Sequence, residues 1–342
     1  MRLERKASLL FLISLALYFT FSLVVSIGLT SWDLLDNKNA VYAASALFVS
    51  VPAFLIPALI FRGKNRSEME RFRAPRFSHI MIAVALGYGC VQLSGALSYL
   101  NEAIFYGVEI KSNSTTAQDL LSVNGLIMFF AIAVLPPLTE EFIMRGTLLE
   151  SWRRTSPVWA AVLTSALFAF LHLAPSSFIV YFGMGMMFAL VYLITRNVWL
   201  TVVMHFVNNL YAVLAALFLK AFPEALEGAE SAIAEADAYS QLLDSRLGSL
   251  MKFFTYAAIA AAILVPMTLL LRSIYRRNHL GMYKVEPAGE ADPIEAEPEP
   301  VYLPGEKKPS LFADPVLWVV LAILVVLNVI YGLSEFGVIG AD

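Results

Sequence analysis

The chain has 342 residues, of which 59% are hydrophobic and 15% are charged, and its formal net charge is −3. Soluble globular proteins are about 45–50% apolar, so this composition excludes an ordinary soluble domain and predicts an all-α, polytopic membrane protein. The single cysteine, Cys90, excludes an internal disulfide and a cysteine-based metal cage.

Nine segments are predicted to be membrane-spanning helices, because a span needs about 20 predominantly apolar residues. In chain order they cover 8–30, 40–61, 78–100, 119–152, 157–173, 176–194, 198–219, 250–271 and 315–333. The first segment follows basic residues, as in a signal peptide, but its apolar stretch exceeds the roughly 7–15 residues of a signal sequence. We therefore interpret it as the first span.

Lysine and arginine are concentrated in every second loop, and this bias predicts the orientation of the spans. The basic ends and loops are 2–6, 62–76, 153–154, 196 and 272–277. This alternation predicts a cytoplasmic N-terminus and an external C-terminus for a chain with nine spans. We expect a multi-pass protein of a bacterial plasma membrane.

The spans and the segments between them suggest six parts. These are N-terminal transmembrane helices (1–118), a core that carries the polar motifs (119–219), an acidic external segment (220–249), a further transmembrane helix (250–271), a cytoplasmic linker rich in Pro and Glu (272–312) and a C-terminal transmembrane helix (313–342). The linker composition cannot bury a core. We therefore expect the ninth span to be an appendage to the main bundle.

The fourth span contains two adjacent carboxylates, Glu140 and Glu141. A charged group near the centre of a bilayer costs about 3 kcal/mol or more, so such residues are rare and usually functional. Pro136 and Pro137 precede them and are expected to break or kink the helix. The glutamates would then begin a new helical stretch, whose N-terminus favours negative charge.

Polar side chains recur at a spacing of four in three predicted spans, and residues four apart share a helix face. The pairs are Glu141 and Arg145, Phe168 and His172, and His205 and Asn209. Isolated polar groups in hydrocarbon are costly, so we expect the three helices to converge on one polar cavity.

Each pair also has a purely structural interpretation. Glu141 and Arg145 could form a structural ion pair, and His172 could be an interfacial or satisfied core histidine. His205 and Asn209 could join helices by hydrogen bonds worth about 0.6 kcal/mol each. Asn208 competes with Asn209 for that role. The combination of all three pairs favours a functional cavity over these separate interpretations.

The chemistry that such a cavity favours is peptide hydrolysis within the membrane. Burial beside a second carboxylate suits Glu140 to act as a general base on a water held between it and His172. His205 and Asn209 could donate hydrogen bonds to the developing oxyanion. Arg145 would keep Glu141 ionised. We expect no metal or other cofactor; zinc bound by two His and two Glu is the alternative.

The motifs Glu140-Glu141-x-x-x-Arg145, Phe168-x-x-x-His172 and His205-x-x-x-Asn209 resemble the three signature motifs of the CPBP family. This family joins type II CAAX prenyl proteases with bacterial bacteriocin-processing and immunity (Abi-type) proteins. The resemblance covers roughly residues 120–215.

The resemblance implies an eight-helix, glutamate-dependent intramembrane endopeptidase that works without metal. It implies Glu140 as the catalytic base, His172 as the residue that assists the water, His205 and Asn209 as the oxyanion hole, and Glu141 with Arg145 as a supporting pair. The implied partners are the lipid bilayer and a peptide or membrane-protein substrate, with no role for nucleic acid.

Two features depart from the family pattern: the ninth span and the long segment at 221–249. No residue identifies a prenyl-binding groove, so the resemblance leaves the substrate open. A non-catalytic protein that binds a membrane peptide, confers bacteriocin immunity or acts as a scaffold is the main alternative. A proton or ion transporter that uses the buried carboxylates as a relay is a third hypothesis.

Overall fold

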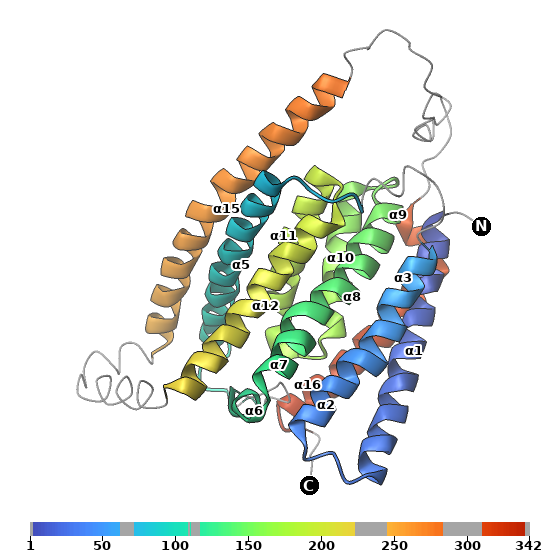
Figure 1. The fold of residues 1–342 in the computed structure, drawn as a ribbon, viewed down its shortest axis with the longest axis vertical. Coiled ribbons are helices and arrows are strands. Elements are labelled where there is room, and N and C mark those ends of the chain that lie inside the picture. The colour runs from blue at the N-terminus through green and yellow to red at the C-terminus, as the bar shows by residue number, and fades with distance from the viewer. Residues whose placement is uncertain are drawn as a thin grey trace.

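The computed structural model describes residues 3–61, 72–108, 110, 117–222, 245–282 and 310–338. All regular structure in these residues is helical (Figure 1). Eight helices are long and apolar enough to cross a membrane: Leu3–Ser31, Lys38–Phe61, Phe77–Ile104, Gly125–Trp152, Pro175–Thr195, Val198–Ala221, Arg246–Tyr275 and Pro315–Glu335. The predicted all-α, polytopic bundle is therefore confirmed.

Several of these helices are composite. The α-helical segments are α1 (Leu3–Ser31), α2 (Lys38–Ala44), α3 (Ile56–Phe61), α5 (Phe77–Ile104), α6 (Ala117–Ser122), α7 (Gly125–Met128), α8 (Leu135–Ile143), α9 (Glu150–Trp152), α10 (Pro157–Leu171), α11 (Phe178–Thr195), α12 (Val198–Ala221), α15 (Arg246–Met282) and α16 (Pro315–Glu335). The π-helical segments are η1 (Ser45–Leu55), η2 (Phe129–Val134) and η3 (Met144–Leu149), and the 3₁₀ turns are η4 (Pro175–Ser177) and η5 (Leu311–Ala313).

Side-chain caps explain where the helices of the core begin. The side chain of Asn197 accepts a hydrogen bond from the backbone N–H of Leu200 at the start of α12, and Ser156 caps α10 in the same way. Asp314 caps α16, with Pro315 in the first helical position. These residues satisfy backbone donors that a helix N-terminus leaves free, so the ends of these helices are encoded locally.

The fourth predicted span differs from expectation, because the helix Gly125–Trp152 is continuous through Pro136 and Pro137. The prolines lie at the start of α8, directly after the π-helical η2. The predicted break is therefore wrong, whereas the predicted kink stays a prediction. Glu140 and Glu141 lie inside this helix, and the expected stabilisation by a free helix N-terminus does not apply.

The fifth predicted span is a helix, but a short one. The 15 residues of α10 rise about 22 Å, less than the roughly 30 Å of a hydrocarbon core. Since the basic pair Arg153 and Arg154 precedes α10 and is expected at the membrane surface, we expect the turn at the other end of α10, residues 172–177, to lie at membrane depth. The hairpin of α10 and α11 therefore carries His172 into the interior of the bundle.

The bundle has two flanks and a centre. Figure 1 shows α15 and α5 on one flank, α1 with α2 and α3 on the other, and α8, α10, α11 and α12 between them. Helix α5 packs against both α15 and α12, and α10 packs against α11. The largest apolar core cluster lies where α1, α8, η3, α10 and α11 meet.

Helix α16 is not the appendage that the sequence suggested. It packs against α1, α10 and η4, and its residues Leu317, Val320 and Leu324 are buried in the main core cluster. The expectation failed because it considered only the composition of the preceding segment. Contacts between residues far apart in sequence hold α16 in place.

Two predicted non-membrane parts cannot be compared in full with the structure. Residues 223–244 and 283–309, which make up most of the acidic segment and most of the linker, lie outside the described residues. Helix α15 extends beyond both ends of the predicted span at 250–271.

Candidate active site

A fully buried ion pair lies at the centre of the site. Arg145 Nη1 donates to Glu141 Oε1 at 3.0 Å, and both side chains have 0% exposure. Arg145 Nη2 donates to the backbone carbonyl of Gly185 in α11 at 2.9 Å. The predicted pair of Glu141 and Arg145 is thus present, and it links the helix Gly125–Trp152 to α11.

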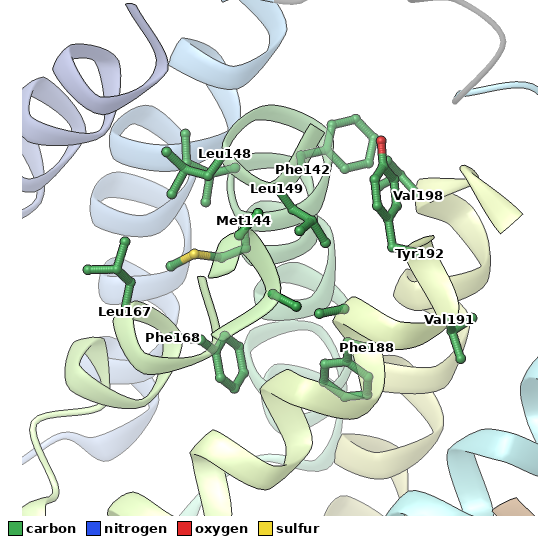
Figure 2. Close-up of a cluster of buried hydrophobic side chains, with 14 of the residues drawn as sticks. Phe142, Met144, Leu148, Leu149, Leu167, Phe168, Phe188, Val191, Tyr192 and Val198 are labelled. Atoms are coloured by element: carbon green, nitrogen blue, oxygen red, sulfur yellow. The ribbon is translucent and has the colours of Figure 1, made fainter. Parts of the chain in front are cut away.

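Two aromatic rings enclose the guanidinium group of Arg145. Its carbon Cζ lies 5.0 Å from the centroid of Phe168 and 5.3 Å from that of Phe188. Figure 2 shows these two phenylalanines together at one end of the buried apolar cluster. Cation–π contacts contribute about 2 kcal/mol or more when the cation is desolvated, so the rings help to hold a charge that water does not reach.

Gly185 brings α10 and α11 together beside this pair. A Cβ atom at Gly185 would lie 3.0 Å from both Cα and Cβ of Ser165 in α10, closer than ordinary contact. The absence of a side chain therefore permits this close packing of the two helices. The backbone carbonyl of Gly185 also accepts the hydrogen bond from Arg145. The packing of α10 against α11 and a hydrogen bond of the buried guanidinium group therefore depend on the same residue.

His205 connects the two glutamates. Its Nδ1 lies 3.1 Å from Glu141 Oε1, and its Nε2 lies 4.0 Å from Glu140 Oε2. The ring stacks on Phe188, with centroids 5.0 Å apart. An ionised Glu141 accepts a hydrogen bond from Nδ1–H, which fixes the ring with Nε2 towards Glu140.

Glu140 differs from its neighbour because its side chain borders a cavity. This cavity has a volume of about 220 Å³ and is lined by Tyr18, Ser50, Phe54, Glu140, Phe168, Leu171 and His172. The Glu140 side chain is 23% exposed, whereas that of Glu141 has no exposure. Within the described part of the chain, Glu140 Oε2 is buried and has no hydrogen-bond partner. Because the Glu140 side chain borders the cavity, this carboxylate can act on a molecule there.

His172 lines the same cavity as Glu140. Its Nδ1 lies 2.7 Å from the backbone carbonyl of Phe168, an acceptor, so Nδ1 carries a proton and donates. In a neutral ring this leaves Nε2 as the nitrogen with a free lone pair. The ring stacks on Tyr181 of α11 at a centroid distance of 3.8 Å. The turn after α10 therefore places one oriented proton acceptor beside the cavity.

Asn209 lies one helical turn beyond His205 and is not among the residues that line the cavity. Its Nδ2 donates to the backbone carbonyl of Ile132 in η2 at 2.9 Å, and its side-chain oxygen accepts from Asn208. This contact joins α12 to the π-helical stretch that precedes α8. The predicted contribution of Asn209 to an oxyanion hole stays a prediction.

A second cavity, of about 180 Å³, shares Tyr18 and Ser50 with the first. It lies between α1 and the helix formed by α2 and η1, and it includes the hydroxyl-bearing residues Ser22, Ser26 and Ser45. Tyr18 and Ser50 therefore border both cavities. The lining of the second cavity combines serine hydroxyls with aliphatic side chains.

The described residues do not assemble a metal centre. No group of three or more His, Cys, Asp or Glu side chains among them is arranged to hold a metal ion. The four candidate ligands Glu140, Glu141, His172 and His205 are instead divided between the cavity and the ion pair. The expectation of a site without metal stays a prediction.

Sequence motifs did not reveal several residues that complete the site. Tyr18 and Ser50 line the cavity, Gly185 and Phe188 contact Arg145, and Tyr181 supports His172. These are ordinary residues of apolar helices, and no local pattern distinguishes them. Ser50 differs from the others in one structural respect, because it lies in the π-helical segment η1. Segments of this kind are often found at functional sites.

Comparisons with known proteins match the motif-bearing part of the chain. Residues 122–211 match the family described as type II CAAX prenyl endopeptidase Rce1-like. The membrane-embedded CAAX protease MroQ of Staphylococcus aureus (strain USA300) is 25% identical over 201 residues, which cover 56% of this chain and 79% of the relative. The putative membrane peptidase YdiL of Bacillus subtilis (strain 168) is 25% identical over 169 residues, which cover 49% and 69%. No solved structure gives a significant match.

These findings confirm the resemblance to the CAAX-protease family that the three motifs indicated. Together with the eight apolar helices they support a membrane-embedded peptidase.

Proposed function

We propose that the chain is an intramembrane endopeptidase in which Glu140 activates water for attack on a peptide bond. The observation that carries the proposal is the cavity shared by Glu140 and His172. A carboxylate with a free oxygen and an imidazole with a free lone pair border one space inside a bundle of apolar helices. General base catalysis of this kind contributes about 10²–10⁴-fold to a rate.

The roles of the side chains follow from their hydrogen bonds. Glu140 takes a proton from the water and later gives it to the amide nitrogen of the leaving product. His172 Nε2 accepts the second hydrogen of the water and orients its oxygen towards the carbonyl carbon. Glu141, fixed by Arg145, holds His205 so that Nε2 faces Glu140. Protonated at both nitrogens, His205 would donate to the developing oxyanion, assisted by Asn209.

We further propose that the reaction needs no metal. The support is the division of the acidic and histidine side chains described above, since Glu141 Oε1 already accepts hydrogen bonds from Arg145 and from His205 Nδ1. A zinc ion at a catalytic site needs three protein ligands with one open position. Elemental analysis showing one zinc ion per active chain, lost in His172→Ala, would contradict this part of the proposal.

The substrate class that we propose is a peptide or membrane protein that enters from within the bilayer of a bacterial plasma membrane, with the N-terminus of the enzyme in the cytoplasm. The serine hydroxyls that line the second cavity support a peptide substrate, because they can bond its backbone. The name of one relative refers to CAAX substrates. That substrate belongs to the relative, and our proposal does not include a prenyl group.

Membrane proteomics of a strain that carries Glu140→Gln, compared with wild type, tests the proposal. We expect an uncleaved membrane protein or peptide to accumulate in the variant, and purified wild-type protein in liposomes to cleave it. Glu140→Gln and His172→Ala should each reduce this cleavage by about 10³-fold, while both proteins insert and purify as folded species. Full activity of purified Glu140→Gln would refute the mechanism. A Glu140→Gln strain that behaves as wild type in complementation would instead favour the non-catalytic binding or immunity function.

A further inference from the structure

The turn that carries His172 is unusual for its location. Residues 172–177 connect α10 and α11 at a position that we expect to lie at membrane depth. Leu173 has a φ of +48°, which residues other than glycine rarely adopt. Non-helical backbone within a bilayer is tolerated only where protein or water satisfies its polar groups. A partner for this backbone is therefore a structural requirement.

Helix α16 supplies partners on both sides of the turn. Asn328 Nδ2 donates to the carbonyl of Phe170, two residues before His172, at 2.9 Å. Glu335 Oε2 accepts a hydrogen bond from the backbone N–H of Ser176 at 3.0 Å. Asn328 is 7% exposed and Glu335 1%, so neither contact lies on the surface.

Glu335 also occupies a favourable electrostatic position. Ser176 belongs to the first turn of the helix Pro175–Thr195, so the carboxylate sits where the backbone N–H groups and the helix dipole favour negative charge. Gly332, one turn earlier in α16, packs against the Pro175 ring. Glu335 thus caps a helix from a distant part of the chain.

The capped helix reaches His172 through Tyr181. Tyr181 lies on the first turns of α11, and its ring stacks on the imidazole of His172. Asn328 fixes the last turn of α10, whose Phe168 carbonyl accepts from His172 Nδ1. Both groups that orient the His172 ring are therefore on segments that α16 holds.

We propose that α16 is a positioning element for His172 and acts through Asn328 and Glu335. This role rests on the proposed function, because it concerns the imidazole that orients the water. This role would explain why an otherwise apolar helix carries an amide, Asn328, and a carboxylate, Glu335. They do not touch the substrate; they keep the Nε2 atom of His172 directed to the cavity.

The test compares full-length variants in liposomes. Glu335→Leu removes the acceptor, Glu335→Gln keeps an oxygen that can accept the Ser176 N–H, and Asn328→Leu removes the donor. Val329→Ala, next to Asn328 but 55% exposed on α16, is the matched control. Hydrogen–deuterium exchange of residues 170–182 reports the turn. Cleavage of a fluorogenic peptide copied from the site that proteomics identifies reports kcat and KM.

We expect Glu335→Leu and Asn328→Leu to speed exchange in residues 170–182 and to lower kcat by up to about 10²-fold with KM nearly unchanged, since small misplacements of a catalytic group have effects of this size. Glu335→Gln should retain most of kcat, and Val329→Ala should match wild type in both measurements. Unchanged exchange in Glu335→Leu would overturn the proposal. So would faster exchange with unchanged kcat, or an equal loss of kcat in Val329→Ala.

The two proposals fail in different ways. A wild-type protein that cleaves no peptide refutes the proposed function and with it the catalytic meaning of this role. A wild-type protein that cleaves, with Asn328 and Glu335 variants that cleave equally well, refutes only the role of α16. The exchange measurement does not depend on activity and decides separately whether α16 orders the turn.

Discussion

The helix Gly125–Trp152 carries two acidic clusters, and the protein satisfies them to different degrees. Glu150 accepts four hydrogen bonds of 2.8 Å: two from Arg153, one from Arg196 and one from Tyr192. About 13 Å along the same helix, Glu141 accepts two hydrogen bonds, both on Oε1. Among the described residues no hydrogen-bond partner reaches Oε2 of Glu141 or of Glu140.

The contrast separates structural from chemical use of a buried carboxylate. Buried polar atoms are almost always hydrogen-bonded, so a complete set of partners indicates a role in holding elements together. Glu150 joins the end of its helix to the end of α11 in this way. Glu140, with a free oxygen beside a cavity, retains the capacity to bind and to accept a proton. Replacing Glu150 should therefore lower stability and spare activity, whereas replacing Glu140 should lower activity and spare stability.

Glu150→Ala should give the largest loss of stability of the variants considered. It leaves the guanidinium groups of Arg153 and Arg196 without their carboxylate, and because these groups are 17% and 37% exposed, the loss should be about 3 kcal/mol, at the lower end of the range for a buried network. Denaturant unfolding in lipid bicelles measures the change. The activity of the molecules that remain folded should be close to that of wild type, because Glu150 is remote from the cavity.

Glu140→Gln is the control for that experiment. It should unfold within about 1 kcal/mol of wild type, because Glu140 Oε2 has no hydrogen-bond partner among the described residues and its ionic contact with His205 Nε2 is long, at 4.0 Å. If Glu140→Gln proved as destabilising as Glu150→Ala, Glu140 would be a structural residue. The contrast between the two clusters would then be lost.

Gly185→Ala should disturb the cavity end of the same helix to a smaller extent. The added methyl group meets Ser165 at 3.0 Å, and overpacking of this kind costs about 1–3 kcal/mol. It should also reduce cleavage, because the Gly185 carbonyl holds Arg145, which holds Glu141. Thermal unfolding and the cleavage rate in liposomes test both effects.

The same substitution at Gly28 provides the comparison, since its added methyl would have no described heavy atom within 4 Å. Gly28→Ala should be neutral or slightly stabilising, because alanine favours the helix by about 1 kcal/mol. Equal destabilisation at both positions would show that close packing at Gly185 is not the cause.

The sequence predicted the acidic end of the site because charges in apolar spans are rare. Glu140, Glu141 and Arg145 were identified on that ground, and the structure places the last two in contact. The same rule applies to Asn328 and Glu335, which also lie at the apolar ninth span. Their contacts, with residues more than 150 positions away, have no local signal, and the linker composition suggested an appendage instead.

The geometry of the site was harder to predict from the sequence than the identity of its residues. Alternation of apolar and basic segments predicted the helices, but it could not distinguish a full span from the short α10. Proline propensity predicted a break at Pro136, yet the backbone continues through a π-helical stretch. Such stretches depend on tertiary packing rather than on local preference. The cavity, whose lining combines residues of α1, η1, α8 and α10, has the same origin.

Asn209→Ala should have the smallest effect of the variants considered. Its Nδ2 bonds the Ile132 carbonyl, and hydrogen bonds between membrane helices contribute about 0.6 kcal/mol on average. If Asn209 only joins α12 to η2, the stability should fall by about that amount and cleavage should change by less than about threefold.

Cleavage rates at saturating substrate distinguish this outcome from the oxyanion role. Loss of one oxyanion donor typically lowers kcat by about 10²–10³-fold, far more than loss of a helix contact. Asn208→Ala, which removes the donor to the Asn209 side-chain oxygen, is the matched control. A large fall in kcat in Asn209→Ala alone would require its amide to leave Ile132 and turn towards the cavity when substrate binds. The Ile132 carbonyl in η2 would then bind Asn209 only in the absence of substrate. The polar groups available to the substrate would then include Asn209 on α12 as well as Glu140 on α8.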